Sequence, residues 1–297
     1  MNMNKFVIIG DSTCDLSFEV REKYALDYIK MGYVIDEVTY PASLDWESHS
    51  VHDFYDLMRK GKYVRTVQIT REETLATFKK HLELGEDIIY ISCSSALSGS
   101  YNFGALIAKE LKAEYPEREI YCVDSLCSTL GQGMLIIKAC QLKEAGKSAE
   151  EIVQWLLDNR LRANQYATVE SLEYLRRVGR VTASSAFFGN LFGVKPIILS
   201  DIKGRNYAFK KVKGALNARN EIARLICEAA EDSENETLYI SHADNLEGAE
   251  ALRDAILAIR PFKDVCIGYI GPIVGASVGP GTIISFCFGK VVTIEGN

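Results

Sequence analysis

The sequence is poor in the residues that most catalytic and metal sites use. It has four histidines in 297 residues, and its eight cysteines form no C-x-x-C pair and no cysteine-histidine spacing suited to zinc. We therefore expect no metal site and no cofactor, and we interpret the cysteines as small buried residues in a reducing compartment.

Long apolar runs and basic clusters are also missing. No stretch reaches the roughly 18 apolar residues of a membrane span, and the first residues lead directly into a strand without a signal peptide. Basic residues come at most in pairs and the net charge is −6. The sequence therefore has no basic cluster that would attract nucleic acid or anionic membranes. We expect a cytoplasmic protein with no nucleic-acid partner and no stable membrane insertion.

Familiar nucleotide and hydrolase motifs are absent or incomplete. There is no Walker A sequence, and no G-x-G-x-x-G follows a strand. Residues 275–279 match the G-x-S-x-G pattern of a nucleophile elbow, but Pro280 follows them and no histidine comes after His242. Nucleotide binding by these routes and serine hydrolysis are therefore not predicted.

The apolar pattern predicts an α/β protein with two domains. Strands at 5–10, 87–91 and 119–123 are each followed by a polar turn and a helix, which predicts a parallel sheet with right-handed crossovers. The pattern changes near Arg162, and 297 residues suit two domains of roughly 150 residues each. We expect an N-terminal parallel-sheet α/β domain over 1–163 and a C-terminal mixed-sheet α/β domain over 164–297.

The most informative polar cluster lies between the strand at 87–91 and the helix that follows it. Five serines stand within residues 92–100, where the end of a strand meets the N-terminus of a helix. Such a turn can hold a small anionic group, although serines there can equally well only cap the helix and fill the turn. A second polar edge is expected at Thr66 and Gln68, whose side chains share one side of an extended segment.

The composition of two further segments is compatible with more than one structural role. The apolar stretch 183–194 contains four large side chains that could be core or could line an elongated apolar cavity or its lid; they are Phe187, Phe188, Leu191 and Phe192. The glycine-rich stretch 271–281 permits a ligand or another chain segment to come close to the backbone. The sequence shows no catalytic triad, no set of metal ligands and no paired carboxylates. These features therefore favour a ligand-binding site over a catalytic site.

Six segments, in this order, resemble the successive motifs of the DegV family. They are DSTCD at 11–15, TVQIT at 66–70, SSALSGSY at 94–101, DS at 124–125 with GQG at 131–133, LRRVGRV at 175–181 and GPG at 279–281. The resemblance implies a two-domain α/β protein that binds one long-chain fatty acid in a tunnel between its domains. It also implies a separate fatty acid kinase, to which the protein presents the acyl carboxylate for phosphorylation without being the catalyst itself.

The resemblance also suggests roles for individual residues. Thr66 and Ser98, or Ser98's neighbours Ser94 and Ser95, are similar to the hydroxyls that hold the carboxylate, and Arg180 is similar to an arginine at the tunnel mouth that meets the kinase. Where the family often has His-Thr, this chain has Ser277 and Val278, so Ser277 is the expected polar contact there.

Two other functions are compatible with the same residues. One is a lipid carrier or sensor that works without a kinase. The other is an enzyme acting on a small phosphorylated or carboxylated metabolite, with Asp11 at the end of the first strand handling a phosphoryl group, or with Asp15 or Asp124 as the catalytic acid.

Overall fold

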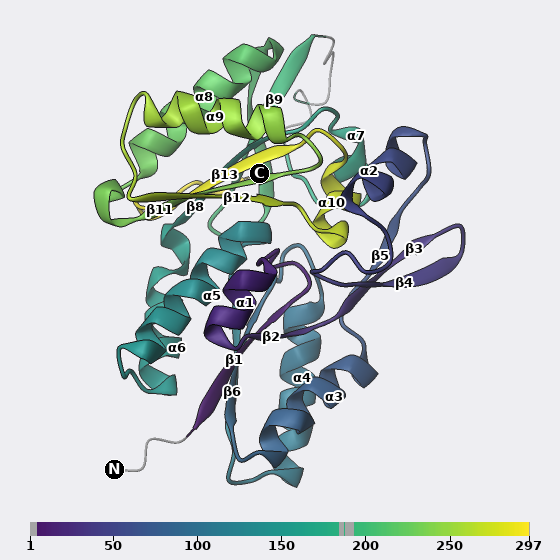
Figure 1. Cartoon of the computed structure of the whole chain (residues 1–297), viewed down its shortest axis with the longest axis vertical. Helices are drawn as coiled ribbons and strands as arrows, with labels where there is room; N and C mark the ends of the chain where they lie inside the picture. The colour runs from purple at the N-terminus through teal and green to yellow at the C-terminus, as the bar shows by residue number, and fades with distance from the viewer. Residues whose placement is uncertain (1–4, 184–186, 188–192, 297) are drawn as a thin grey trace.

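The computed structural model describes residues 5–183, 187 and 193–296, which form two α/β domains stacked end to end (Figure 1). The N-terminal domain contains a four-stranded sheet in the order β2-β1-β6-β7, and all its pairs are parallel, as predicted. Its strands are β1 (Phe6–Asp11), β2 (Asp27–Ile29), β6 (Asp87–Ser92) and β7 (Ile120–Asp124). Every residue of β1 and β6 is buried, which is typical of parallel strands covered on both faces.

Helices cover both faces of this sheet. Helices α5 and α6 pack together on one side, while α3 and α4 pack together on the other (Figure 1). The helices of this domain are α1 (Phe18–Tyr24), α2 (Val51–Arg59), α3 (Arg71–Glu83), α4 (Ser100–Glu114), α5 (Thr129–Glu144) and α6 (Ala149–Asn159). The capping box of α6 is present: Ser148 Oγ accepts from Glu151 N at 3.3 Å, and the Glu151 carboxylate accepts from Ser148 N at 2.8 Å.

A second, antiparallel sheet in the order β4-β3-β5 was not predicted from the sequence. Its strands are β3 (Met31–Ile35), β4 (Val38–Ala42) and β5 (Arg65–Val67), and β5 is an edge strand. The pairing of β3 with β5 joins segments about thirty residues apart, and no local periodicity in the sequence reports such a pairing. This sheet carries Thr66 to the junction of the two domains (Figure 1).

The C-terminal domain is built on a six-stranded mixed sheet, as predicted. Its order is β10-β9-β8-β13-β11-β12, in which β11 and β12 are parallel and the other pairs are antiparallel. The strands are β8 (Ala163–Thr168), β9 (Val194–Ser200), β10 (Asn206–Lys213), β11 (Thr237–His242), β12 (Asp264–Tyr269) and β13 (Ile283–Phe288). Helices α8 (Gly214–Ala229) and α9 (Leu246–Leu257) cover its outer face (Figure 1).

The inner face of this sheet packs against the N-terminal domain. One continuous apolar cluster runs from Ile9 of β1 to Phe286 of β13, and a Cβ added at Gly131 of α5 would lie 2.8 Å from the Phe286 ring. A smaller cluster lies between the sheet and helices α8 and α9. The two domains therefore share one core, which holds their facing surfaces at a defined distance.

The glycine-rich stretch forms a short helix, α10 (Pro272–Val278), an element that its composition did not predict. A Cβ at Gly275 would collide with the Tyr55 hydroxyl, which itself donates to the Ile270 carbonyl at 2.5 Å. The expected close approach therefore exists, and the approaching segment is helix α2. The short helix α7 (Glu173–Arg177) lies beside α10.

The described residues also form the 3-10 turns η1 (Arg160–Arg162) and η3 (Ser233–Asn235). Within the described ranges, every helix is too short or too polar to cross a membrane.

Candidate functional site

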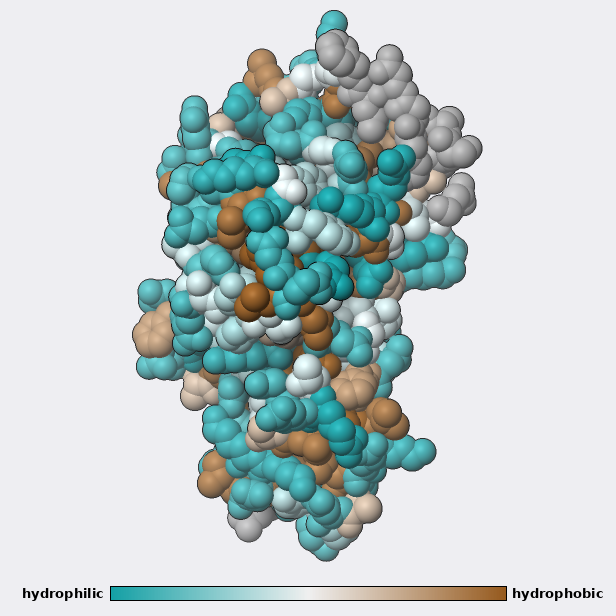
Figure 2. Space-filling model, turned by 90° about the vertical axis from the view of Figure 1, so that its right-hand side faces the viewer, coloured by the Kyte–Doolittle hydropathy of each residue, from teal (hydrophilic) through white to brown (hydrophobic). Residues whose placement is uncertain are grey.

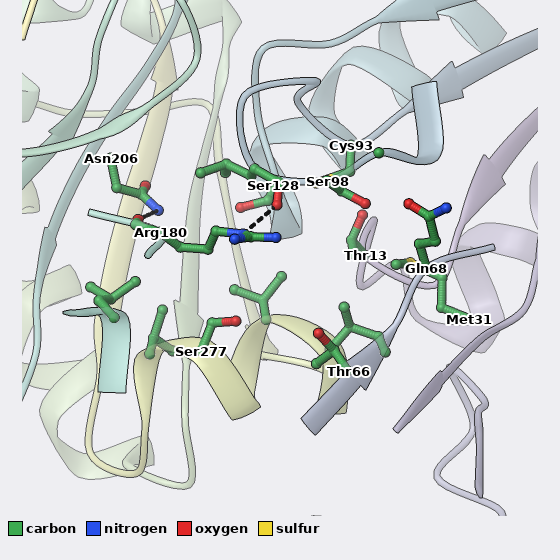
Figure 3. A pocket seen from close by; sticks show the side chains of 16 residues that line it. Thr13, Met31, Thr66, Gln68, Cys93, Ser98, Ser128, Arg180, Asn206 and Ser277 are labelled. Atoms are coloured by element: carbon green, nitrogen blue, oxygen red, sulfur yellow. Dashed lines mark hydrogen bonds between the residues drawn. The ribbon is translucent and has the colours of Figure 1, made fainter. Parts of the chain in front are cut away.

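A cavity of about 240 Å³ lies at the junction of the two domains. Figure 3 shows its lining from close by, with side chains from both domains pointing toward a common space. The polar lining residues are Thr13, Thr66, Gln68, Cys93, Ser98, Ser128, Arg180, Asn206 and Ser277, and the apolar ones are Met31, Leu97, Leu175, Ile273, Val274 and Val278, with Gly99 between them. On the face shown in Figure 2, hydrophobic residues emerge among hydrophilic ones near the level where the domains meet.

Four of the residues that were predicted to contact the ligand or its partner line this cavity. Thr66 comes from β5, Ser98 from the turn before α4, Arg180 from the loop after α7, and Ser277 from α10. These residues are separated by up to 211 positions in the chain, so only the packing of the two domains brings them together. Thr66 and Arg180 are exposed, whereas Ser98 and Ser277 are half-buried.

Ser94 and Ser95 do not line the cavity. The Ser94 hydroxyl is fully buried and donates to the Gly204 carbonyl at 2.9 Å, which ties the serine turn to the β9-β10 connection. Ser95 is exposed, and its backbone N–H donates to Asp124 Oδ1 at 3.1 Å. The lining of the cavity therefore includes neither of these two serines, which were predicted as carboxylate contacts.

The Ser98 hydroxyl is held at the start of α4. Its Oγ lies 2.9 Å from Ser100 Oγ and accepts from the Ser100 backbone N–H at 3.2 Å. The N-cap residue of this fifteen-residue helix is Gly99, which has no side chain to accept from the first-turn N–H groups. The turn therefore presents a hydroxyl beside the positive end of a helix dipole.

Arg180 joins the two domains across the cavity. Its Nε donates to the Leu97 carbonyl at 2.7 Å (Figure 3). Its Nη1 donates to the Val178 carbonyl at 2.7 Å. Its own carbonyl accepts from Asn206 Nδ2 at 3.1 Å. Within the described part of the chain, Nη2 has no hydrogen-bond or ion-pair partner, so the guanidinium keeps donor capacity for another molecule.

Asp11 organises the buried side of the cavity. It is fully buried, and its Oδ2 accepts from the Tyr90 hydroxyl and the Cys93 N–H, both at 3.0 Å. Its Oδ1 accepts from the Thr13 N–H at 3.0 Å and from Gln132 Nε2 at 3.2 Å. The Thr13 hydroxyl lies within hydrogen-bond reach of both the Asp11 carboxylate and Gln132 Oε1.

This hydrogen-bond network fixes the positions of residues that line the cavity, and its polar groups are hydrogen-bonded to one another. Burial raises the pKa of Tyr90 well above its ordinary value, and the Asp11 charge beside it adds to the shift, so the phenol remains a neutral donor. Both oxygens of the Asp11 carboxylate already accept hydrogen bonds from buried protein donors, which would have to be given up by a phosphoryl acceptor. Asp11 instead holds Thr13 and Cys93, both of which face the cavity.

The other acids considered for catalysis also lie away from the cavity. Both carboxylate oxygens of Asp15 are buried without a hydrogen-bond partner, and burial raises its pKa well above its ordinary value. Asp124 Oδ1 accepts from the backbone N–H groups of Ser95 and Leu126. Among the described lining residues there is no aspartate, glutamate, histidine or lysine, and the described chain holds no cluster of three such side chains or cysteines that could bind a metal.

Several cavity residues were not identified as binding residues from the sequence. Alternation did predict that Thr66 and Gln68 share one side of their segment, and both face the cavity. A Cβ at Gly99 would collide with Gln68 Oε1, so this glycine permits the amide to lie against the serine turn. No pattern in the sequence pointed to Ser128 or Asn206, which reach the cavity only through domain packing.

Of the four large apolar residues expected to line a tunnel or a lid, only Phe187 is described. It is buried in the shared core, and Lys211 Nζ lies 4.9 Å from the centre of its ring. It is not among the residues that line the cavity. Phe188, Leu191 and Phe192 lie outside the described residues.

Known proteins of similar sequence belong to the family that the order of the motifs indicated. A sequence profile described as "Uncharacterised protein, DegV family" matches residues 5–289. The chain is 33% identical to the DegV domain-containing protein CPE0026 of Clostridium perfringens, with 97% of this chain and 98% of that protein aligned. It is 29% identical to Protein DegV of Bacillus subtilis, with 95% and 98% of the two chains aligned.

Solved structures with the same fold include fatty-acid-binding members. A DegV family protein from Thermus thermophilus, described by its fatty acid binding, has a TM-score of 0.87 and 26% identity over 96% of this chain and 100% of that one. DegV of Bacillus subtilis, described as a fatty acid binding protein, has a TM-score of 0.80 and 27% identity over 96% and 99%. With the profile match covering nearly the whole sequence, this chain belongs to the DegV family.

Proposed function

We propose that this protein binds one long-chain fatty acid, with the carboxylate in the cavity between the domains and the acyl chain in a tunnel that continues from it. The observation that carries the proposal is the composition of the lining. Hydroxyl, amide and guanidinium donors converge there with apolar side chains, and the described lining has no acid that would repel a carboxylate. The fatty acids described for the relatives from Thermus thermophilus and Bacillus subtilis support the same ligand class.

Thr66, Ser98 and Ser277 are the residues that we assign to the carboxylate. Hydroxyls can rotate to donate to either carboxylate oxygen, and the first turn of α4 adds a favourable dipole beside Ser98. The apolar side chains of Met31, Leu97 and Ile273 would meet the first methylenes of the acyl chain.

Burial of the acyl tail contributes more to the binding free energy of such a ligand than the hydrogen bonds of its carboxylate do. Burial of about fifteen methylenes at roughly 0.8 kcal/mol each contributes on the order of 12 kcal/mol before the costs of binding. A hydrogen bond to a charged group adds about 1.5–3 kcal/mol. The tail therefore supplies most of the affinity, and the hydroxyls mainly set the position of the carboxylate.

We further propose that the protein serves a separate fatty acid kinase and is not itself an enzyme. Arg180 is exposed at the cavity and keeps a free Nη2, which suits contact with a partner or with a phosphoryl group being transferred. A carrier or sensor without a kinase would need the same cavity but no such contact. We also propose the domain boundary at 163/164; β8, the first strand in the chain that belongs to the C-terminal sheet, begins one residue earlier, at Ala163.

Native mass spectrometry of the purified protein tests the ligand. We expect a bound fatty acid of about 14 to 18 carbons, or uptake of added palmitate or oleate after organic extraction. An empty protein that takes up neither compound contradicts the proposal. Addition of a fatty acid kinase and ATP to the loaded protein then separates the two forms of the function, since only the kinase-linked form gives an acyl phosphate.

A further inference from the structure

A second cavity, of about 300 Å³, lies on the outer side of the C-terminal domain. It is formed where the N-terminal ends of α8 and α9 meet the ends of β8 and β13, and it shares no lining residue with the cavity between the domains. Its volume is at the lower end of the range for small-molecule sites. A ligand there would be separate from the proposed fatty acid.

Two polar groups at this cavity are buried without a partner. The atoms are Thr168 Oγ1 and Arg219 Nε, and both residues line the cavity. A buried polar atom without a hydrogen bond costs about 1–3 kcal/mol, which is why such atoms are rare in folded proteins. Two of them at one cavity indicate that a molecule in the cavity, water or ligand, completes their hydrogen bonds.

The charges around the cavity leave one cation unpaired. Lys195 Nζ forms an ion pair with Glu170 Oε2 at 2.5 Å, so these two side chains neutralise each other. Glu247, the other acid in the lining, is exposed. Within the described ranges Arg219 takes part in no ion pair or hydrogen bond, and its guanidinium is suited to a carboxylate.

The other polar side chain of the lining, Asn245, is hydrogen-bonded to Gly248 N and the Gly281 carbonyl, and the remaining lining residues are apolar or glycine. Ile222 and Leu252 form the inner wall between the helices, and Ile283 of β13 forms the floor. Leu216 also lines the cavity, and 58% of its surface is exposed. An apolar ligand body would cover part of that surface.

We infer that this cavity is a second ligand site, which takes a monocarboxylate with an apolar body shorter than that of a long-chain fatty acid. The carboxylate accepts hydrogen bonds from Arg219 Nε and the Thr168 hydroxyl, and the apolar body lies against Leu216, Ile222 and Leu252. The inference goes beyond the proposed function, because it concerns another face of the molecule and another size of ligand.

Octanoate, with octanol as the uncharged comparison, tests this site in the full-length protein. Amide chemical shifts should move at Thr168, Arg219 and Gly248 as octanoate is added, and octanol should bind more weakly. Arg219→Met should weaken octanoate binding about tenfold or more, because it removes a charge-assisted hydrogen bond. Ser98→Ala, which alters only the cavity between the domains, should leave these shifts unchanged.

Three results would overturn the inference. The first is that millimolar octanoate causes no chemical-shift change at these residues. The second is that octanol and octanoate bind equally well, and the third is that Arg219→Met binds octanoate as tightly as the original protein does. If Arg219→Met lowers the melting temperature, Thr168→Val provides the second variant, since it removes the other donor while keeping the shape of the side chain. Because the readout is specific to residues, it does not depend on what the first cavity binds.

Discussion

Arg180 donates from Nε to the carbonyl of Leu97 at 2.7 Å, and this bond joins the loop after α7 to the serine turn before α4. The two segments belong to different domains and both line the cavity between them. A guanidinium held in this way stays beside the cavity that we propose for the carboxylate and does not fill it. Arg180 is therefore placed for the proposed contact with a kinase or with the phosphoryl group that it transfers.

Replacement of Arg180 by alanine should separate ligand binding from phosphorylation. The fatty acid Kd is expected to change by less than about threefold, because burial of the tail supplies most of the affinity. Transfer of phosphate by the kinase partner should slow by at least about tenfold, since a charge-assisted contact is lost. Arg180→Lys is the matched control, and it should recover part of the rate. Loss of lipid binding in Arg180→Ala would show that our division of roles is wrong.

The double variant Thr66→Ala, Ser98→Ala should weaken fatty acid binding. In the proposed complex each hydroxyl donates to the charged carboxylate, a hydrogen bond of about 1.5–3 kcal/mol, so we expect a loss of tenfold or more, measured by titration with a fluorescent fatty acid. Ser95→Ala is the control, because Ser95 belongs to the same turn but its side chain is exposed outside the cavity. Equal losses in the control and the double variant would remove the assignment of the carboxylate to these two hydroxyls.

Asp11→Asn should destabilise the protein. The substitution puts an NH2 group where the carboxylate now accepts from buried donors, among them the Tyr90 hydroxyl and the Cys93 N–H. We expect a decrease of about 3 kcal/mol in the free energy of unfolding, measured by urea denaturation. If Asp11 were instead a phosphoryl acceptor, the variant would keep its stability and lose an activity.

Asp15→Asn should stabilise the protein at neutral pH. Burial raises the pKa of Asp15, and the nearby Asp11 charge raises it further, while a backbone contact with Gly271 lowers it. The folded state therefore binds a proton that the unfolded state releases above its own pKa of about 4. The stability from this group is fully present below that pH and is lost as the pH rises toward the folded-state pKa.

The pH dependence distinguishes this effect from simple repacking. The stability of Asp15→Asn relative to the original protein should increase as the pH rises above the unfolded-state pKa of about 4, measured by urea denaturation at several pH values. Asp124→Asn is a suitable comparison, because the Asp124 carboxylate accepts two backbone hydrogen bonds. Parallel stability curves for Asp15→Asn and the original protein would mean that Asp15 is ionised in the folded state.

Local pattern was sufficient to predict most of the regular elements. Buried parallel strands are continuous apolar runs, as in β6, and helix starts carry capping residues such as Ser148 with Glu151. The antiparallel sheet of β3, β4 and β5 was missed because its pairing is not local. Helix α10 was missed because glycine has low helix propensity, which close packing against Tyr55 overrides.

The sequence by itself determined the two-domain α/β fold, the family and the polar turns at which a ligand was expected. These follow from the order of short motifs and from side-chain periodicity, both of which are properties of neighbouring residues. Only the tertiary structure decided that Ser98, and not Ser94 or Ser95, faces the cavity together with Thr66, Arg180 and Ser277. A hydroxyl's partner depends on which distant segment packs against its turn, and in this protein Gly204 occupies the partner position at Ser94 while the space beside Ser98 remains open.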